Sequence, residues 1–143
     1  MYENMSDILH ERKVGDYSLE KFTIGQKDLY AMVHGILPGN YIRLTHRREV
    51  VMSDTYMEKR TNANFVKNAH GNVLIGGLGI GMILLAIQDK IDVDKIVVVE
   101  KSEEVIELVK DQLPLNNKVE IVNADVWEYV PAFKFNTIYM DIW

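Results

Sequence analysis

The chain has 143 residues, of which 48% are apolar and 26% charged, as expected for one folded globular domain. Acidic residues outnumber basic ones by 21 to 16, so we expect a small-molecule partner and no nucleic acid. Cysteine is absent, which excludes disulfides and thiolate catalysis and fits the reducing conditions of a cytoplasmic protein.

Neither a metal site nor a membrane segment is predicted. The four histidines are too far apart in sequence to form a ligand pair at helical spacing. The most apolar window, residues 73–87, is shorter than the roughly 20 residues of a membrane helix and contains glycines near its start. A buried strand followed by a buried helix explains this window better.

Residues 1–71 are expected to form an N-terminal layer of a β-hairpin and helices. In chain order the patterns predict a short helix over 6–13, a strand over 17–24, a turn at 38–40 and a hairpin over 41–54 with its tip at 46–48. A longer helix then begins near Thr55, because Thr55 and Glu58 have the spacing of a capping box. Gly71 marks its end.

From residue 72 onward, strands and helices alternate. The predicted order is a strand over 72–77, a helix over 81–90, a strand over 95–100, a helix over 102–112, a strand over 119–124, a short helical turn over 126–130 and a strand over 135–143. The strands are nearly continuous apolar runs, which is typical of a parallel sheet with helices on both faces. The sequence therefore predicts an α/β fold.

The segment GGLGIG, residues 76–81, lies between the first of these strands and the following helix. Its G-x-G-x-G pattern permits a sharp turn, and the next helix is expected to offer unpaired amide donors and its positive dipole end to a polar group. Alternatively, the glycines only allow the helix to pack tightly on the strand. The cofactor-binding candidates in this loop are Gly76, Gly77, Leu78, Gly79 and Gly81.

Glu100 ends the next strand, 19 residues after Gly81. A carboxylate at this place can accept hydrogen bonds from both ribose hydroxyls of a nucleotide. The alternative is an acid at a strand end that faces solvent, but the spacing favours the nucleotide site. Lys101, the next residue, is a further candidate.

Asp125 ends the third strand of this region, so its carboxylate is expected at the same edge of the sheet as Glu100. Asp125 can accept a hydrogen bond from an adenine amine, with Val126 beside it, or it can cap the predicted turn at 126–130. Trp127 can lie against the adenine ring, although a large apolar residue is more often part of the core.

Asp141 ends the fourth strand, which the right-handed crossover rule places beside the glycine loop. There it would face the reactive end of the cofactor and could bind an ammonium group or orient an acceptor. An acid at a strand end is often only solvated. Asp141 is nevertheless the catalytic candidate of this sequence, and it is also a cofactor-binding candidate.

Residues 72–143 resemble class I S-adenosylmethionine-dependent methyltransferases, with NVLIGGLGIGM, VVVEKS, NADVWEY and FNTIYMDIW as their four motifs in order. The resemblance implies a Rossmann-like parallel sheet in the order 3-2-1-4 and S-adenosylmethionine as cofactor. It further implies that the loop glycines border the methionine part of the cofactor, that Glu100 binds the ribose and that Asp125 binds the adenine.

Within that superfamily, residues 41–71 are similar in layout to aminopropyltransferases of the spermidine synthase type. The ending Asp-Ile-Trp departs from the two-aspartate motif of those enzymes, so methyl transfer to an unidentified acceptor is the leading hypothesis. Aminopropyl transfer from decarboxylated S-adenosylmethionine and a non-catalytic cofactor-binding or assembly module are the alternatives. A nicotinamide dehydrogenase also stays open, although Met82 stands where the last glycine of G-x-G-x-x-G would fall.

The family sheet normally has the order 3-2-1-4-5-7-6, and the sequence ends after the fourth strand. We therefore expect either a fragment or a reduced protein that forms a homo-oligomer covering the apolar strand edge at 135–143.

Charged residues of the N-terminal layer provide weaker candidates. Asp54 and Glu58 are close enough in sequence to the predicted helix start to contact cofactor or acceptor, but capping and solvation are favoured. Arg47 and Arg48 can bind an acidic acceptor, although a charged hairpin tip is the commoner explanation.

Overall fold

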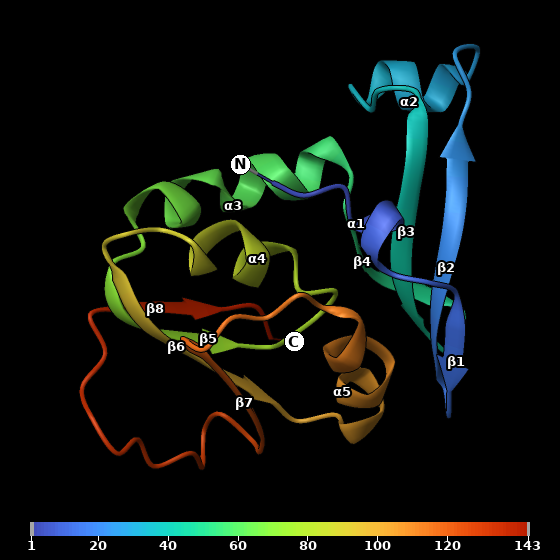
Figure 1. Ribbon diagram of the computed structural model, residues 1–143. Coiled ribbons are helices and arrows are strands. Elements are labelled where there is room, and N and C mark those ends of the chain that lie inside the picture. Colours follow the sequence, from blue (N-terminus) through green and yellow to red (C-terminus); the bar gives the residue numbers. More distant parts are fainter. Residues whose placement is uncertain (1, 143) are drawn as a thin grey trace.

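Two four-stranded sheets pack against each other in the computed structural model, which describes residues 2–142 (Figure 1). The first sheet is antiparallel, in the order β1 (Arg12–Val14), β2 (Tyr17–Ile24), β3 (Gly39–His46), β4 (Glu49–Ser53). The second is parallel, in the order β7 (Val119–Asn123), β6 (Val93–Glu100), β5 (Gly71–Gly76), β8 (Thr137–Met140). The helices are α1 (Met5–Ile8), α2 (Leu29–Val33), α3 (Tyr56–Asn68), α4 (Met82–Gln88) and α5 (Glu103–Val109), and a 3₁₀ turn (Lys110–Gln112) follows α5.

The antiparallel sheet confirms the predicted strand over 17–24 and the predicted hairpin. Strands β3 and β4 meet at Arg47 and Arg48, whose φ angles are 51° and 70°. Positive φ at both central residues suits the right-handed twist of a two-residue hairpin but is strained for side chains other than glycine, asparagine and aspartate. The backbone carbonyl of Asp16 accepts a hydrogen bond from the Arg47 N–H at 2.9 Å, which fixes the tip against the β1–β2 turn.

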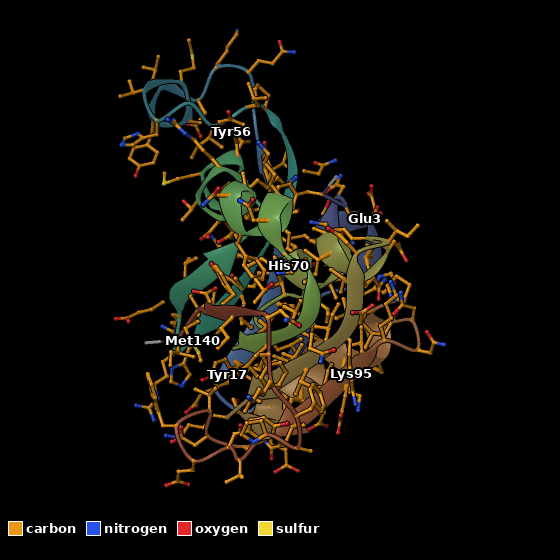
Figure 2. The ribbon with its side chains drawn as sticks, turned by 90° about the vertical axis from the view of Figure 1, so that its left-hand side faces the viewer. Glu3, Tyr17, Tyr56, His70, Lys95 and Met140 are labelled. Carbon is orange, nitrogen blue, oxygen red and sulfur yellow. The ribbon has the colours of Figure 1, made fainter. Side chains whose placement is uncertain are left out.

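The N-terminal layer departs from the prediction at two helices. The helix expected over 6–13 is only the single turn α1, because the chain extends after Ile8 to pair β1 with β2. Helix α2 was not predicted. Its N-terminus is capped by Asp28, whose carboxylate accepts from the Ala31 N–H at 2.9 Å. Figures 1 and 2 show α2 at the projecting end of the antiparallel sheet, away from the parallel one.

Helix α3 begins at Tyr56, one residue after the predicted start, but the capping box does not form. The Thr55 hydroxyl lies 3.1 Å from the Ser53 hydroxyl instead of accepting from the backbone of the first helical turn. The helix packs against β8, where the rings of Phe65 and Tyr139 are 4.7 Å apart and the Tyr139 hydroxyl donates to Asn62. α3 thus covers the inner face of this edge strand.

Helices cover one face of the parallel sheet, whereas the sequence predicts them on both. α4 and α5 pack on the face formed by Val73, Ile75, Ile96 and Val98. The opposite face is covered by the segment 124–136 through its apolar side chains, namely Val126, Tyr129, Phe133 and Phe135. The prediction of helices on both faces is therefore wrong for residues 2–142.

The short helical turn predicted over 126–130 is present as a hydrogen-bonded turn over residues 126–128. The Glu128 N–H bonds to the Asp125 carbonyl at 3.0 Å, and the Asp125 carboxylate accepts from the Trp127 N–H at 3.0 Å. This local bond from side chain to backbone offers the chain an alternative to helical hydrogen bonding, and Pro131 prevents the helix from extending.

Strand β8 lies at the edge of the parallel sheet and, in the part of the chain that the structure describes, pairs with β5 alone. Its outward side chains Ile138 and Met140 are exposed, whereas Tyr139 faces α3. Trp143, the last residue of the strand predicted over 135–143, lies outside the described residues. Among residues 2–142, no helix combines the length and apolar character that a bilayer crossing demands.

Candidate functional site

A cavity of about 450 Å³ lies where the carboxyl ends of the parallel strands meet the antiparallel sheet. Its volume falls within the range of roughly 300–1,000 Å³ that is typical of small-molecule sites. The parallel strands supply one wall and the N-terminal layer supplies the other. The cavity therefore exists only because the two sheets dock against each other.

Seven of the predicted cofactor-binding residues line this cavity, including the catalytic candidate. They are Gly77, Gly79, Glu100, Lys101, Asp125, Val126 and Asp141. The other three candidates are not part of the lining. Gly76 is buried against Met140 and Val126, Leu78 is buried, and Gly81 packs against Leu113 as the N-cap of α4. The role of these residues as cofactor ligands stays a prediction.

The glycine loop requires glycine for its own geometry. Gly77 has φ +100°, and a Cβ at this residue would lie 2.5 Å from the backbone oxygen of Asp141. Gly81 has φ +78°, and a Cβ there would meet Leu113 at 2.6 Å. Side chains at either position would be strained, and at Gly77 the added Cβ would also collide with fixed backbone. The tight packing that the sequence left as an alternative is therefore present.

The amides of this loop are mostly satisfied within the protein. The Gly77 N–H donates to the Val99 carbonyl at 2.9 Å, and the Gly81 N–H donates to the Leu78 carbonyl at 3.0 Å. The Ile80 N–H donates to the Met52 sulfur at 3.2 Å. These loop amides therefore point into the protein. The sequence expects unpaired donors from the first turn of the following helix α4 instead, and that expectation stays a prediction.

Glu100 joins the glycine loop to the end of β6. Its Oε2 accepts from the Leu78 N–H at 2.9 Å, and its Oε1 accepts from the Ser102 N–H at 3.4 Å. Burial raises the pKa of this carboxyl, and Asp141 adds to the effect, while the two backbone hydrogen bonds oppose it. Each carboxylate oxygen has a second lone pair, so Glu100 can still accept hydrogen bonds from a ligand in the cavity.

Asp125 is held by two contacts just after β7, the strand that pairs with β6. One oxygen accepts from the Trp127 N–H, and the other lies 3.6 Å from the Lys101 ammonium group. The local role that the sequence left open for Asp125, stabilising the turn after β7, is therefore present. Trp127 is 77% exposed and borders the cavity, so it does not belong to the core.

Asp141 marks an acidic side of the cavity. Its N–H donates to the Gly76 carbonyl at 2.9 Å, which continues the β5–β8 pairing, and burial raises the pKa of its carboxyl. Burial and the charge of Asp141 together raise the pKa of Glu58. Burial, Asp141, Glu58 and Tyr2 raise the pKa of Tyr139 to about 12. Acidic groups are therefore close together between β8 and α3, and their proximity and burial disfavour full ionisation of all of them.

Four lining residues from the antiparallel sheet were not among the sequence candidates. They are Tyr17, Leu44, Val51 and Met52. Tyr17, which Figure 2 labels on β2, stacks on His46 with ring centroids 4.3 Å apart. The alternation of β2 indicates which side chains share a face, but it gives no sign that this face meets the glycine loop. The docking of the two sheets is what brings these residues to the site.

The charged candidates of the N-terminal layer lie outside the cavity lining. Asp54 is fully buried, and its Oδ1 accepts from the Ile42 N–H at 2.9 Å. Arg47 pairs with Asp16 at 3.2 Å on the surface. Residues 2–142 contain no group of three or more His, Asp or Glu side chains placed to hold a metal ion.

The fold and the cavity define an α/β chain with a Rossmann-like parallel sheet and an antiparallel layer. Spermidine synthase from Thermotoga maritima has a similar fold, with a TM-score of 0.61 and 21% sequence identity. The match covers 93% of this chain and 47% of the synthase, so the chain spans about half the length of that protein. No protein-family model matches the sequence, and no curated protein does.

Proposed function

We propose that the chain binds S-adenosylmethionine in this cavity and belongs to a methyltransferase-like protein that transfers the methyl group to an unidentified acceptor. The observation that carries the proposal is the position of Glu100. Its carboxylate lies at the end of the second parallel strand, is bonded to the glycine loop and lines the same cavity as Asp125. The strand order β7-β6-β5-β8 supports the proposal because it places the ends of β5, β6 and β7 side by side.

The residues present fit this cofactor in their chemistry. Glu100 would accept from the ribose hydroxyls, and Asp125 with the backbone near Val126 would bind the adenine edge. Trp127, exposed at the rim, offers an aromatic surface to the adenine ring. The cofactor would supply a methyl group already activated by a sulfonium, so the protein contributes mainly orientation and electrostatics.

Aminopropyl transfer from decarboxylated S-adenosylmethionine is the second candidate, and the charge of the cavity favours it. The lining contains four carboxylates, of Glu100, Glu104, Asp125 and Asp141, and one lysine, Lys101. That lysine already lies beside Asp125. A cofactor without its own carboxylate would meet less repulsion from these acids than S-adenosylmethionine would.

Calorimetry with S-adenosylmethionine, its demethylated product and the decarboxylated cofactor tests both candidates. Glu100→Ala should weaken binding by about tenfold or more, because hydrogen bonds to a charged group contribute roughly 1.5–3 kcal/mol. Glu103→Ala is the matched control, since this acid is three residues away, exposed and outside the cavity lining. Its affinity should stay within about twofold of the unmodified chain.

The outcomes separate the hypotheses. If none of the three ligands binds, or if Glu100→Ala leaves binding unchanged, the nucleotide site is excluded. A preference of about tenfold or more for the decarboxylated cofactor favours aminopropyl transfer over methyl transfer. Binding without transfer of either group to any acceptor fraction favours the cofactor-binding or assembly module instead.

A further inference from the structure

We propose that Met52 is a positioning residue, whose thioether reaches from the antiparallel sheet into the glycine loop and holds the loop in its bent conformation. The docking of the N-terminal layer and the shape of the nucleotide cavity are thereby coupled through one side chain. The effect of Met52 on the loop is argued from the geometry of the structure. Its effect on ligand affinity rests on the proposed function.

The first observation is the hydrogen bond of the Ile80 amide. Ile80 is fully buried, and its N–H donates to the Met52 sulfur at 3.2 Å. A buried backbone amide without an acceptor costs about 1–3 kcal/mol. Thioether sulfur is a weak acceptor, yet it is the acceptor that the structure gives this amide within residues 2–142. Strand β4 therefore completes the hydrogen bonding of a loop that belongs to the other sheet.

The second observation is the space beside Gly79. This residue has φ +53°, and a Cβ built on it would lie 2.0 Å from the Met52 sulfur and 2.9 Å from its terminal methyl group. The space that a side chain at residue 79 would occupy is thus filled by the Met52 side chain. The positive φ and this contact favour glycine at this position for reasons inside the protein, because a larger residue would displace the Met52 side chain.

The third observation is the direction of the Met52 side chain. Met52 pairs with Leu44, and the register between β3 and β4 shifts between Leu44 and Thr45. A bulge of this kind turns the strand and redirects its side chains, and such bulges recur beside functional sites. Met52 is 8% exposed and lines the cavity together with Gly77, Gly79 and Asp141. Its sulfur is thus next to the ligand space and the loop at once.

These contacts divide the loop into two parts. The amides of Gly77, Leu78 and Gly81 find their acceptors within residues 71–143, so the parallel sheet holds them. The Ile80 amide depends on β4 instead. Loss of the Met52 sulfur is therefore expected to loosen the loop at Ile80 while the rest of the core keeps its hydrogen bonds.

Amide hydrogen exchange in the ligand-free protein tests the effect on the loop. Met52→Leu keeps the volume of the side chain but removes the sulfur, and exchange at Ile80 should accelerate by about tenfold or more. The Val98 amide, within buried β6, is the internal reference and should change far less. Met5→Leu is the matched control, because Met5 is also a fully buried methionine of the N-terminal layer but does not line the cavity.

Two further variants keep the proposal open to refutation if Met52→Leu fails to fold. Met52→Gln retains an acceptor at similar reach and should keep Ile80 protected. In a double-mutant cycle, Gly79→Ala should shift the urea midpoint less when Met52 is already alanine, because the space is then free. Unchanged exchange at Ile80, or additive shifts in the cycle, overturns the proposal.

Ligand affinity separates this proposal from the proposed function. With S-adenosylmethionine as the probe, Met52→Leu should weaken binding by about fivefold or more, while Met5→Leu stays within about twofold. If the unmodified chain binds no nucleotide, the proposed function fails, and the exchange at Ile80 still decides the role of Met52. If exchange accelerates but affinity is unchanged, the coupling to the cavity is overturned.

Discussion

The two sheets of this protein differ in how much of each is removed from water. In the parallel sheet, residues 96–98 of β6 are fully buried, because both faces of this strand are covered. In the antiparallel sheet, the far end carries α2 with Leu29, Tyr30 and Val33 exposed. The parallel sheet is therefore the scaffold of the site, and the antiparallel sheet is a layer docked on it at one end.

One apolar cluster nevertheless spans both sheets. Leu19, Ile42 and Leu44 of the antiparallel sheet belong to the same buried cluster as Val73 and Ile96 of the parallel one. Since the cavity lies where the sheets meet, its two walls are held in place by this shared core. The difference between the sheets thus concerns their outer parts, and their inner faces form a unit.

The largest effect is expected from a cavity made in the shared core. Ile96 of β6 is fully buried, and Ile96→Ala should lower the free energy of unfolding by about 2–5 kcal/mol. Because the core is continuous, signals from both sheets should be lost in one transition. Urea unfolding followed by circular dichroism and by the fluorescence of Tyr and Trp side chains measures both quantities.

The matched control for this change lies in the antiparallel sheet. Val50 of β4 is 56% exposed, and Val50→Ala should change the free energy of unfolding by no more than about 0.5 kcal/mol. Two separate unfolding transitions in either variant would contradict a shared core and would make the sheets independent units.

A smaller change in the free energy of unfolding is expected from three glycine substitutions. They separate the cost of backbone strain from the cost of a steric collision of the new Cβ. Gly77→Ala meets both a positive φ and a backbone oxygen, Gly35→Ala meets a positive φ of +68° in open space, and Gly25→Ala meets neither. Strain alone costs about 1 kcal/mol or somewhat more, so Gly35→Ala should lose about that amount. Gly77→Ala should lose about 2–3 kcal/mol, and Gly25→Ala should be nearly neutral.

Thermal and urea unfolding of the three variants measure how much free energy of unfolding each substitution costs. Equal costs for Gly77→Ala and Gly35→Ala would show that the loop moves away from Asp141 without penalty. That outcome would remove the argument that packing, and not only backbone conformation, requires glycine in the loop.

The parallel sheet could be predicted from the sequence more fully than the antiparallel layer. Runs such as residues 96–99 are apolar throughout, and a strand covered on both faces explains them. Helix α2 carries exposed apolar side chains and no amphipathic period, so its sequence lacks the usual signal. The turn after β7 is predicted as a short helical turn, but its extent is set by the bond from the Asp125 carboxylate to the backbone, which is local and leaves no periodic signal.

Only the wall of the candidate site that the parallel sheet supplies could be predicted from the sequence. Glu100, Asp125 and Asp141 follow from their position at strand ends, because parallel strands bring their carboxyl ends to one edge. Tyr17 and Met52 line the same cavity, but their place depends on how two sheets dock. That docking is determined by side-chain packing across long sequence separations, which no local pattern encodes.

The smallest effect concerns buried acids, which occur in both sheets. Asp54 in the antiparallel layer and Glu100 and Asp141 at the parallel edge all have a pKa raised by burial. The folded state then holds protons more tightly than the unfolded state. The tighter proton binding of the folded state stabilises the fold fully below the ordinary pKa of these acids. This stabilisation is lost as the pH rises through their raised pKa in the folded protein. Stability should therefore decline as the pH rises above the ordinary pKa of these acids and through their raised pKa.

Asp54→Asn shows how much of this decline comes from the antiparallel layer. Asn can keep the acceptor for the Ile42 N–H but does not titrate, whereas the second oxygen of Asp54 is buried without a hydrogen-bond partner among residues 2–142. The slope of unfolding free energy against pH should become less negative in this variant. The free energy of unfolding of Asp54→Asn at a single pH reports a different effect, namely the cost or gain of burying the Asn NH2 group in place of the second carboxylate oxygen. Asp7→Asn is the control, because Asp7 is exposed on α1 and should leave the slope unchanged. If Asp54→Asn leaves the slope unchanged as well, the pH dependence belongs to the parallel edge, where Glu100 and Asp141 face the cavity.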